Sequence, residues 1–262
     1  MLFSRGKLDR YLHSQNGEPP WALVTGASDG IGRQFADVLA SRGFNVIIHG
    51  RNAQKVQLVI DDLSRAHPNR AFRALIANAV HCSTGGHSPL LEALLRPLDD
   101  LNLTVLVNNA GGADPSLRPL QHISSAELAS NILLNATFPT LLTARLLPLL
   151  MRHEPSLVLN VGSMSDAALP LTAAYSASKA YLACLSAQLR REMMLEGRDV
   201  EVLCVRLGTT TGTALNKTPP SFFMPDAKTV AEAALESVGC GRAIELGAGG
   251  MMACSALLAA IR

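Results

Sequence analysis

The chain has 262 residues, a formal net charge of +2 and 48% hydrophobic residues. This length and composition suit one large domain with a substantial buried core. The charges are balanced and no run of lysines or arginines dominates, which argues against nucleic-acid binding and against a strongly polybasic membrane patch. We therefore expect the partner to be a small molecule.

Neither the cysteines nor the amino terminus indicates secretion. The cysteines lack the close pairs of zinc sites and the spacing of a disulfide scaffold: Cys82, Cys184, Cys204, Cys240 and Cys254. We expect buried thiols in a reducing, intracellular compartment, and no metal. Charged residues near the start argue against a cleaved signal peptide: Arg5, Lys7, Asp9 and Arg10. No stretch approaches the roughly 20 apolar residues that span a bilayer.

Short apolar runs alternate with helix-spaced segments from Trp21 onward. Strands are expected at 22–25 and 46–48, and near 72–76, 103–107, 157–161 and 200–205. The helical segments between them end at Gly43, before Pro68 and at Gly197. Strands buried on both faces suit a parallel sheet covered by helices. The sequence predicts a single-domain α/β fold, a Rossmann-type doubly wound parallel sheet with helices on both faces.

Composition also suggests the domain boundaries. The segment 14–20 is interpreted as a linker because it combines Gly and Pro with polar residues. We predict an amino-terminal extension over 1–20, the domain over 21–247 and an apolar tail over 248–262. The tail suits a buried helix or one that contacts a membrane peripherally. Within the domain, Ser124 to Glu127 resembles a capping box that starts a helical stretch, which Pro139 should interrupt or bend.

A glycine-rich turn follows the first predicted strand. It reads Thr-Gly-Ala-Ser-Asp-Gly-Ile-Gly, and its glycines permit a tight turn in which backbone N–H groups approach a phosphate. Its position at the start of a strand-helix-strand unit favours dinucleotide binding over an ordinary turn. The expected cofactor ligands here are Thr25, Gly26, Ser28, Asp29, Gly30, Ile31 and Gly32.

The end of the second strand bears on the choice between NAD and NADP. An NAD enzyme usually offers a carboxylate to the ribose 2′-hydroxyl, whereas here the chain reads His-Gly-Arg-Asn from 49 to 52. A guanidinium without a carboxylate favours a 2′-phosphate, so we predict NADPH/NADP+ with Arg51 as a ligand. Arg33 could reach the phosphate as well, or could be a solvated helix charge.

Two further strand ends offer cofactor contacts. Asn78 could hydrogen-bond adenine through its amide oxygen, or could cap its loop. After the next strand, the small residues following Asn109 should let the backbone lie against the cofactor: Ala110 and Gly111. The doubled asparagine could alternatively terminate the strand.

A phenol and an ammonium group lie on one face of a later predicted helix. Tyr175 and Lys179 are four residues apart. A free phenol has a pKa of about 10, and a nearby cation should lower it, so that Tyr175 could exchange a proton with a substrate oxygen. Ser163, at the end of an earlier strand, could hold that oxygen, with Ser165 in reserve. Either serine could instead be a turn residue.

The order of glycine turn, Asn-Asn-Ala-Gly, Ser and Tyr-x-x-x-Lys resembles the classical short-chain dehydrogenase/reductase family over roughly residues 21 to 240. The resemblance implies a catalytic tetrad of Asn135, Ser163, Tyr175 and Lys179. It implies that the Asn135 backbone helps place a water linked to the lysine. It also implies that Lys179 holds the nicotinamide ribose, so that Tyr175 and Lys179 belong to the cofactor site too.

Within that family, the segments 21–32, 42–48 and 171–175 resemble the very-long-chain 3-oxoacyl-CoA reductase and 17β-hydroxysteroid dehydrogenase branch. This branch implies NADPH, lipid metabolism and hydrophobic ketones of the 3-oxoacyl, steroid-like or polyketide-derived kind. Many members are attached to the endoplasmic reticulum. Because the amino-terminal span common there is lacking, the expected location is cytoplasmic or peripheral at that membrane. The family also implies homo-dimers or tetramers.

The chain departs from the family pattern in several places. Asn78 replaces an aspartate, Leu207 replaces a proline, and the interval from Ser163 to Tyr175 is one residue shorter than usual. The threonine that would contact the nicotinamide carboxamide is either Thr211 or Thr213. The segment 216–225 could be a lid over an apolar substrate or an ordinary surface loop.

The leading hypothesis is an NADPH-dependent oxidoreductase that reduces a hydrophobic ketone, or oxidises the matching alcohol, with Tyr175 as the acid. The alternative is an NADP-binding regulatory or assembly protein with little catalysis. The short interval before Tyr175 and the residue Leu207 motivate that alternative.

Overall fold

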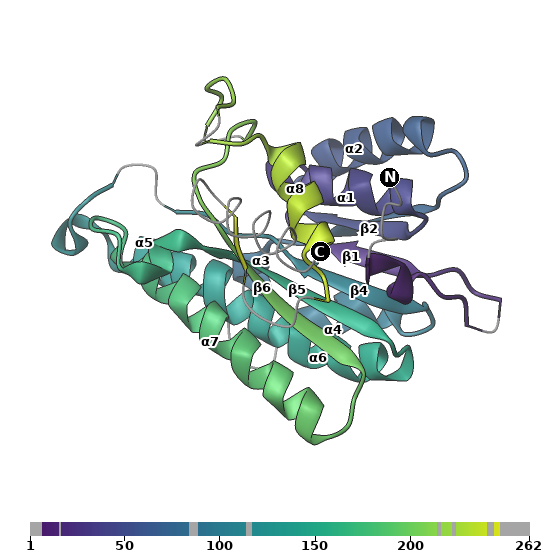
Figure 1. The fold of residues 1–262 in the computed structure, drawn as a ribbon. Coiled ribbons are helices and arrows are strands. Elements are labelled where there is room, and N and C mark those ends of the chain that lie inside the picture. Colours follow the sequence, from purple (N-terminus) through teal and green to yellow (C-terminus); the bar gives the residue numbers. More distant parts are fainter. Residues whose placement is uncertain are drawn as a thin grey trace, which may run out of the picture.

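Seven strands form one parallel sheet in the order β3-β2-β1-β4-β5-β6-β7 (Figure 1). The computed structural model describes residues 7–15, 17–83, 89–113, 117–213, 216–221, 224–239 and 244–246. The strands are β1 (Trp21–Val24), β2 (Asn45–Gly50), β3 (Phe72–Ile76), β4 (Leu103–Asn108), β5 (Ser156–Ser163), β6 (Val200–Leu207) and β7 (Ile244–Leu246). Strand order reverses between β1 and β4, so the predicted doubly wound sheet is confirmed.

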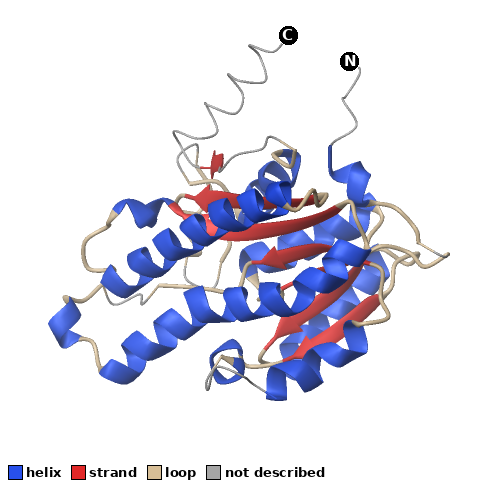
Figure 2. Ribbon diagram, turned by 90° about the horizontal axis from the view of Figure 1, so that it is seen from below, coloured by secondary structure: helices blue, strands red, loops and turns tan. Residues whose placement is uncertain are grey.

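Helices cover both faces of this sheet, as Figure 2 shows. One core cluster includes side chains of α1 (Gly30–Arg42), α2 (Ala53–Ala66) and α8 (Ala227–Glu236). The other includes side chains of α3 (Ala79–Cys82), α4 (Pro89–Leu95), α6 (Phe138–Arg152) and α7 (Ala173–Leu195). The remaining helical elements are η1 (Lys7–Tyr11), η2 (Arg96–Leu98), η3 (Leu120–His122), α5 (Ser125–Ile132), η4 (Leu133–Thr137) and η5 (Met164–Ala167).

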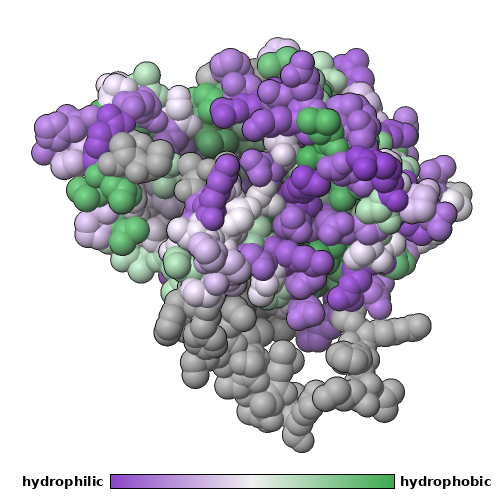
Figure 3. Space-filling model, turned by 90° about the horizontal axis from the view of Figure 1, so that it is seen from above, coloured by the Kyte–Doolittle hydropathy of each residue, from purple (hydrophilic) through white to green (hydrophobic). Residues whose placement is uncertain are grey.

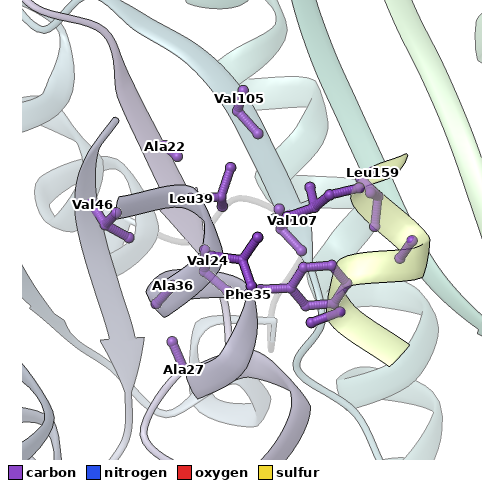
Figure 4. Close-up of a cluster of buried hydrophobic side chains, with 14 of the residues drawn as sticks. Ala22, Val24, Ala27, Phe35, Ala36, Leu39, Val46, Val105, Val107 and Leu159 are labelled. Atoms are coloured by element: carbon purple, nitrogen blue, oxygen red, sulfur yellow. The ribbon is translucent and has the colours of Figure 1, made fainter. Parts of the chain in front are cut away.

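The central strands are buried because both of their faces carry aliphatic side chains. Every residue of β1, β2 and β4 is buried. Phe35 of α1 is fully buried and packs in the same cluster as Val24 and Val107 (Figure 4). Full burial of one such side chain contributes roughly 1.5–3 kcal/mol. Polar residues dominate the face in Figure 3, on which hydrophobic ones form small groups.

Local sequence signals set the helix ends. Asp29, Asn52 and Asp226 cap α1, α2 and α8 with their side chains, which accept backbone N–H groups that a helix start leaves unpaired. The predicted capping box of Ser124 and Glu127 is present at the start of α5. Gly43, with a φ of 114°, ends α1 in the left-handed conformation that favours glycine.

A π-helical turn, η4, joins α5 to α6, whose second residue is Pro139. The resulting helix Ser125–Arg152 is long and apolar enough to cross a membrane by length and composition, so the expectation that no stretch approaches a span was too strong. Pro139 was expected to interrupt or bend this helical stretch; the structure has the π-helical turn η4 just before α6, and the helix continues through Pro139. Leu142, Leu146 and Leu149 of this helix are buried in the core.

The described part of the predicted extension packs against the domain. Leu8 and Tyr11 of η1 are buried in the core, and the Tyr11 hydroxyl donates a hydrogen bond to Glu201 on β6. Burial raises the pKa of Tyr11 strongly, and the bond to Glu201 adds to that rise. The domain boundaries remain predictions, and the tail over 248–262 lies outside the described residues.

Candidate active site

A cavity of about 500 Å³ opens at the carboxyl ends of the central strands, beside the reversal of strand order between β1 and β4. In open α/β sheets this is the place where ligands bind. Its walls come from the glycine turn, the end of β4, the end of β5, α7 and the loop after β6. Predicted site residues that line it are Gly26, Asp29, Gly30, Ile31, Gly32, Asn109, Ala110, Gly111, Ser163, Tyr175 and Lys179.

At the tightest point of the glycine turn, only glycine fits. A Cβ on Gly32 would lie 2.3 Å from the carbonyl oxygen of Gly26, closer than real atoms approach. Gly26 itself has a φ of 65°, in the left-handed region, and a Cβ there would lie 2.9 Å from the Cα of Ala110. Because these close approaches are possible, the N-terminus of α1 lies at the cavity wall, where the positive end of the helix dipole suits a phosphate. These features fit a dinucleotide cofactor.

Thr25 and Asn109 lock this turn to the end of β4. The Thr25 hydroxyl oxygen accepts the backbone N–H groups of Asn109 and Ala110, each at 2.9 Å. In return, the Asn109 amide donates to the Thr25 carbonyl oxygen at 2.8 Å. Thr25 is buried and positions the turn from behind, whereas Asn109 also lines the cavity.

Asp29 and Ser28 complete the turn. The Asp29 carboxylate accepts the N–H of Gly30 at 2.7 Å, so it caps α1 while lining the cavity. Ser28 lies against the end of β2, because a Cβ on Gly50 would come within 3.2 Å of the Ser28 side chain. The absence of a side chain at Gly50 therefore lets β2 approach the turn closely.

The residues predicted to bind the adenosine part of the cofactor have different environments in the structure. Arg51 is exposed and lines a second, neighbouring cavity instead of the first. Asn78 uses its amide oxygen to cap α3, accepting the N–H of Val80 at 3.0 Å, so the capping alternative is observed. Its contact with adenine stays a prediction. Arg33, for which the alternative was a solvated helix charge, forms a partly exposed ion pair of 2.8 Å with Asp62.

Ser163 and Tyr175 meet where β5 faces α7. The Ser163 hydroxyl oxygen accepts the hydroxyl of Ser165 at 2.8 Å and the backbone N–H of Ser165 at 3.2 Å. Its own hydrogen is thus available for the side-chain hydrogen bond with Tyr175. Ser165, the reserve candidate, therefore orients Ser163. The shortened interval still brings serine and tyrosine together, by way of a loop in which Ala168 and Leu171 adopt positive φ values of 72° and 66°.

The expected lowering of the tyrosine pKa is not found. Burial raises the pKa of Tyr175, and the hydrogen bond with Ser163 opposes that shift only in part. The Lys179 ammonium lies 5.7 Å from the centre of the tyrosine ring and donates instead to the Val161 carbonyl oxygen at 2.7 Å. The expectation was wrong because spacing along a helix does not reveal how deeply the phenol is buried.

Lys179 and Asn135 converge on Gly111. Lys179 is 4% exposed, and burial lowers its pKa to about 8. A Cβ on Gly111 would lie 2.7 Å from Asn135 Oδ1 and 3.2 Å from Lys179 Nζ, so glycine leaves room for both. Asn135 Oδ1 accepts the N–H of Gly112 at 2.9 Å, which fixes the loop after β4.

The backbone of Asn135 lies in η4, the π-helical turn. Pro139 is four residues later and has no N–H, so it cannot donate to the Asn135 carbonyl as a helical residue would. π-helical turns are frequent at functional sites. The family-derived expectation that the Asn135 backbone helps place a water stays a prediction.

A second cavity of about 470 Å³ shares Tyr175, Gly112 and Ala113 with the first. Its apolar lining comes from the stretch before α5, from α5 and η4, and from the loop before Tyr175: Ile123, Ala126, Leu128, Leu134 and Leu171. Tyr175 thus lies between the glycine-lined cavity and the second cavity, whose lining also includes Arg51, Glu127 and Asn131. A proton donor in this position can reach ligands in both cavities.

Several residues of the first cavity were not predicted as site residues: Gly162, Thr209 and Thr210. Asn216 of the predicted lid and Thr213, one of the two candidate threonines, also line it. Thr211 is 1% exposed and bridges to Asp226 away from the cavity, so Thr213 is the better placed of the two candidate threonines. Their positions near the end of a strand are the sequence signal that could have identified these residues. The predicted lid is described only at 216–221 and 224–225.

Comparisons with known proteins identify the family of the chain. Residues 20–221 match the family model described as short chain dehydrogenase. The very-long-chain 3-oxoacyl-CoA reductase of Caenorhabditis briggsae is 34% identical over 222 residues, which cover 84% of this chain and 68% of that protein. The reductase of the same description from Aspergillus terreus is 29% identical, over 91% of this chain and 68% of that protein.

Solved structures show the same fold. A short-chain dehydrogenase from Sphingobium yanoikuyae in complex with NADPH has a TM-score of 0.75 and 24% identity, covering 92% of this chain and 93% of that one. A 7β-hydroxysteroid dehydrogenase has a TM-score of 0.76 and 20% identity, with 91% of each chain covered. The predicted family and enzyme class are confirmed. The chain belongs to the short-chain dehydrogenase family and is an oxidoreductase acting on CH–OH or C=O groups.

Proposed function

We propose that this enzyme uses NADPH to reduce the carbonyl of a hydrophobic ketone, or NADP+ to oxidise the matching secondary alcohol. The observation that carries the proposal is the position of Tyr175. Its phenol hydrogen-bonds Ser163, and Tyr175 lines both the glycine-lined cavity and the second cavity beside it. A proton donor is thus available to both a cofactor and a substrate.

A bound reduced nicotinamide would supply a hydride to the carbonyl carbon. The Tyr175 hydroxyl would donate its proton to the carbonyl oxygen, and its raised pKa keeps that proton in place at neutral pH. The Ser163 hydroxyl would hold the same oxygen as negative charge develops on it. Lys179, buried beside the phenol, would hold the nicotinamide ribose and stabilise the tyrosinate through its positive charge.

NADPH is preferred in this proposal because of the residues after β2. Arg51 is exposed at the end of that strand, and its neighbours Gly50 and Asn52 bring no carboxylate to repel a 2′-phosphate. Arg33 contributes less, since Asp62 already pairs with it. The solved relative that binds NADPH is consistent with this choice.

The substrate class follows from the second cavity and from the relatives. The second cavity, of about 470 Å³ beside the phenol, offers the apolar side chains of Leu128, Leu134 and Leu171 to the hydrocarbon portion of a ketone. The relatives named above are very-long-chain 3-oxoacyl-CoA reductases, and one structural neighbour is a hydroxysteroid dehydrogenase. We therefore place 3-oxoacyl thioesters and steroid-like ketones first, before polyketide-derived ketones.

The test is an assay of the purified full-length chain with a panel of these ketones, following the absorbance of NADPH and, in parallel, of NADH. We expect turnover with at least one long-chain or polycyclic ketone, at a kcat/KM for NADPH at least tenfold above that for NADH. Tight NADPH binding without turnover of any ketone or alcohol would contradict the proposal. It would favour the regulatory or assembly alternative.

A further inference from the structure

An ion pair lies directly beside the serine of the site. Arg206 Nε donates to Asp166 Oδ2 at 2.7 Å, and Arg206 Nη2 contacts the other carboxylate oxygen. The two side chains are 24% and 7% exposed, so solvent screens them little. Two parallel contacts from one guanidinium fix the carboxylate in orientation as well as in position.

Asp166 belongs to the same short element that orients the serine. The 3-10 helix η5 begins at Met164, directly after Ser163, whose hydroxyl caps it by accepting the N–H of Ser165. Asp166 follows Ser165 directly, and the residue after η5, Ala168, has a left-handed conformation although it is not glycine. A loop with an unfavourable backbone conformation needs an outside contact to keep it in place. The guanidinium of Arg206 supplies such a contact from the neighbouring strand β6.

The pairing of β5 with β6 places Arg206 beside the end of β5, from which η5 and Asp166 follow. Gly162 lies opposite Arg206 in the parallel pairing of β5 with β6. A Cβ on Gly162 would lie 2.9 Å from the Cys204 sulfur, whereas Arg206 Cγ, at 3.6 Å, would be in ordinary van der Waals contact with it. Glycine at this position therefore leaves room for Cys204, and the arginine stem packs beside the end of β5.

We propose that Asp166 and Arg206 are positioning residues that hold η5, and through it the Ser163 hydroxyl, in line with Tyr175. Neither side chain lines the cofactor cavity among its described residues, so the pair acts through Ser165 and Ser163. The inference rests on the proposed function of Ser163 in holding the substrate oxygen.

The proposal predicts a specific kinetic pattern for Asp166→Asn and Arg206→Met. Because η5 loses its outside contact, Ser163 should no longer stay aligned with the developing charge, and kcat should fall about tenfold to hundredfold. The dissociation constant for NADPH should stay within about twofold, since the glycine turn is untouched. Arg206→Lys keeps the charge but not the paired contact, and it should fall between the wild type and Arg206→Met.

The pair should behave as a unit. The double variant Asp166→Asn/Arg206→Met should lose about as much kcat as either single variant, because each change already breaks the same contact. Arg10→Met is the control, since Arg10 Nη2 donates to both carboxylate oxygens of Asp199, the residue just before β6 and at the opposite end of that strand from Arg206. That contact is 43% and 55% exposed, and kcat should not change when it is removed.

A pH profile of alcohol oxidation separates positioning from a general loss of structure. Tyr175 is flanked by Ser163 of β5 and by Lys179 of α7, which in turn lies near Cys204 of β6. The hydrogen bond from Ser163 lowers the pKa of the phenol, so its loss should move the acid limb of kcat to higher pH. Both ion-pair variants should show this shift, as should Ser163→Ala.

The outcomes are distinguishable. If the wild type turns over a ketone and either ion-pair variant keeps full kcat and an unchanged pH profile, the positioning role is refuted. A variant that loses NADPH binding together with kcat would also refute it, because the effect would then be on the cofactor site. Absence of turnover in the wild type would refute the proposed function instead. NADPH binding by the wild type and by each variant would then show whether each protein is folded.

Discussion

The two walls of the cofactor cavity are held in shape by different means. The glycine turn, residues 25–32, depends on missing side chains and on hydrogen bonds from Thr25 and Asn109 to backbone groups. The serine–tyrosine segment, residues 163–175, is held by side chains from other elements and includes two non-glycine residues with positive φ. The first wall follows from local rules of backbone geometry, whereas the second depends on contacts that tertiary packing creates. Substitutions in the first should affect cofactor affinity, and those in the second should affect kcat.

The largest effect is expected from Gly32→Ala. The new Cβ would lie 2.3 Å from Gly26 O and 2.4 Å from Asn109 Nδ2, so the turn must shift. We expect NADPH affinity to fall by at least about a hundredfold, measured by fluorescence titration. Gly17→Ala is the control: it strains a left-handed residue with φ of 81° but meets no atom within 4 Å. An unchanged affinity in Gly32→Ala would show that this wall is not fixed by steric exclusion.

Ser163→Ala should show the opposite pattern. It removes the hydroxyl that would hold the substrate oxygen, so kcat should fall by on the order of 10² to 10³ while NADPH affinity stays within about twofold. Steady-state kinetics with a saturating ketone, together with the same titration, would check this. A rise in KM at constant kcat would instead assign Ser163 to ground-state binding and blur the distinction between the two walls.

Arg51→Glu tests which cofactor the first wall selects. A carboxylate at the end of β2 should repel a 2′-phosphate and accept a ribose hydroxyl. We expect the ratio of kcat/KM for NADPH over NADH to fall by roughly 10- to 100-fold, with Arg33→Glu as the comparison, since Asp62 engages Arg33. Equal ratios in wild type and Arg51→Glu would contradict the proposed role of Arg51.

Lys179→Met should separate stability from activity in the second wall. Burial lowers the pKa of Lys179 from 10.5 to about 8, so the unfolded chain binds the extra proton between these two values. Wild-type stability should therefore rise with pH across that window, by at most about 3 kcal/mol. The methionine variant should lose this rise and be more stable at pH 7 by about 1–2 kcal/mol, although inactive. Denaturant titrations at pH 7 and pH 10 would measure both, and an unchanged pH dependence would refute the buried-charge account.

The fold was predictable because its signals are local and repeated. The apolar strands, the helix ends at Gly43 and Gly197, and the capping box at Ser124 were all found where the sequence indicated them. β7 was missed, since three residues at a sheet edge give almost no periodic signal. The packing of η1 was missed as well, because its polar surroundings hid the buried Leu8 and Tyr11.

The residues of the candidate site also differ in whether the sequence could predict their positions. Residues of the glycine turn and strand ends could be placed from sequence because strand-to-helix turns have fixed geometry. The pair Asp166 and Arg206 could not, since its members are 40 residues apart and meet only through the register of β5 with β6. The pKa of Tyr175 was expected to fall and is instead raised, because burial depth is a property of the packed structure.

The measurement that tests the central claim most directly compares kcat and NADPH affinity in Tyr175→Phe. This change removes one oxygen, the proposed proton donor, and leaves the ring in its packing. The account predicts that kcat for ketone reduction falls by about 10² to 10⁴ while the dissociation constant for NADPH changes less than about threefold. A variant that retains wild-type turnover would contradict it, since the proton would then come from another group.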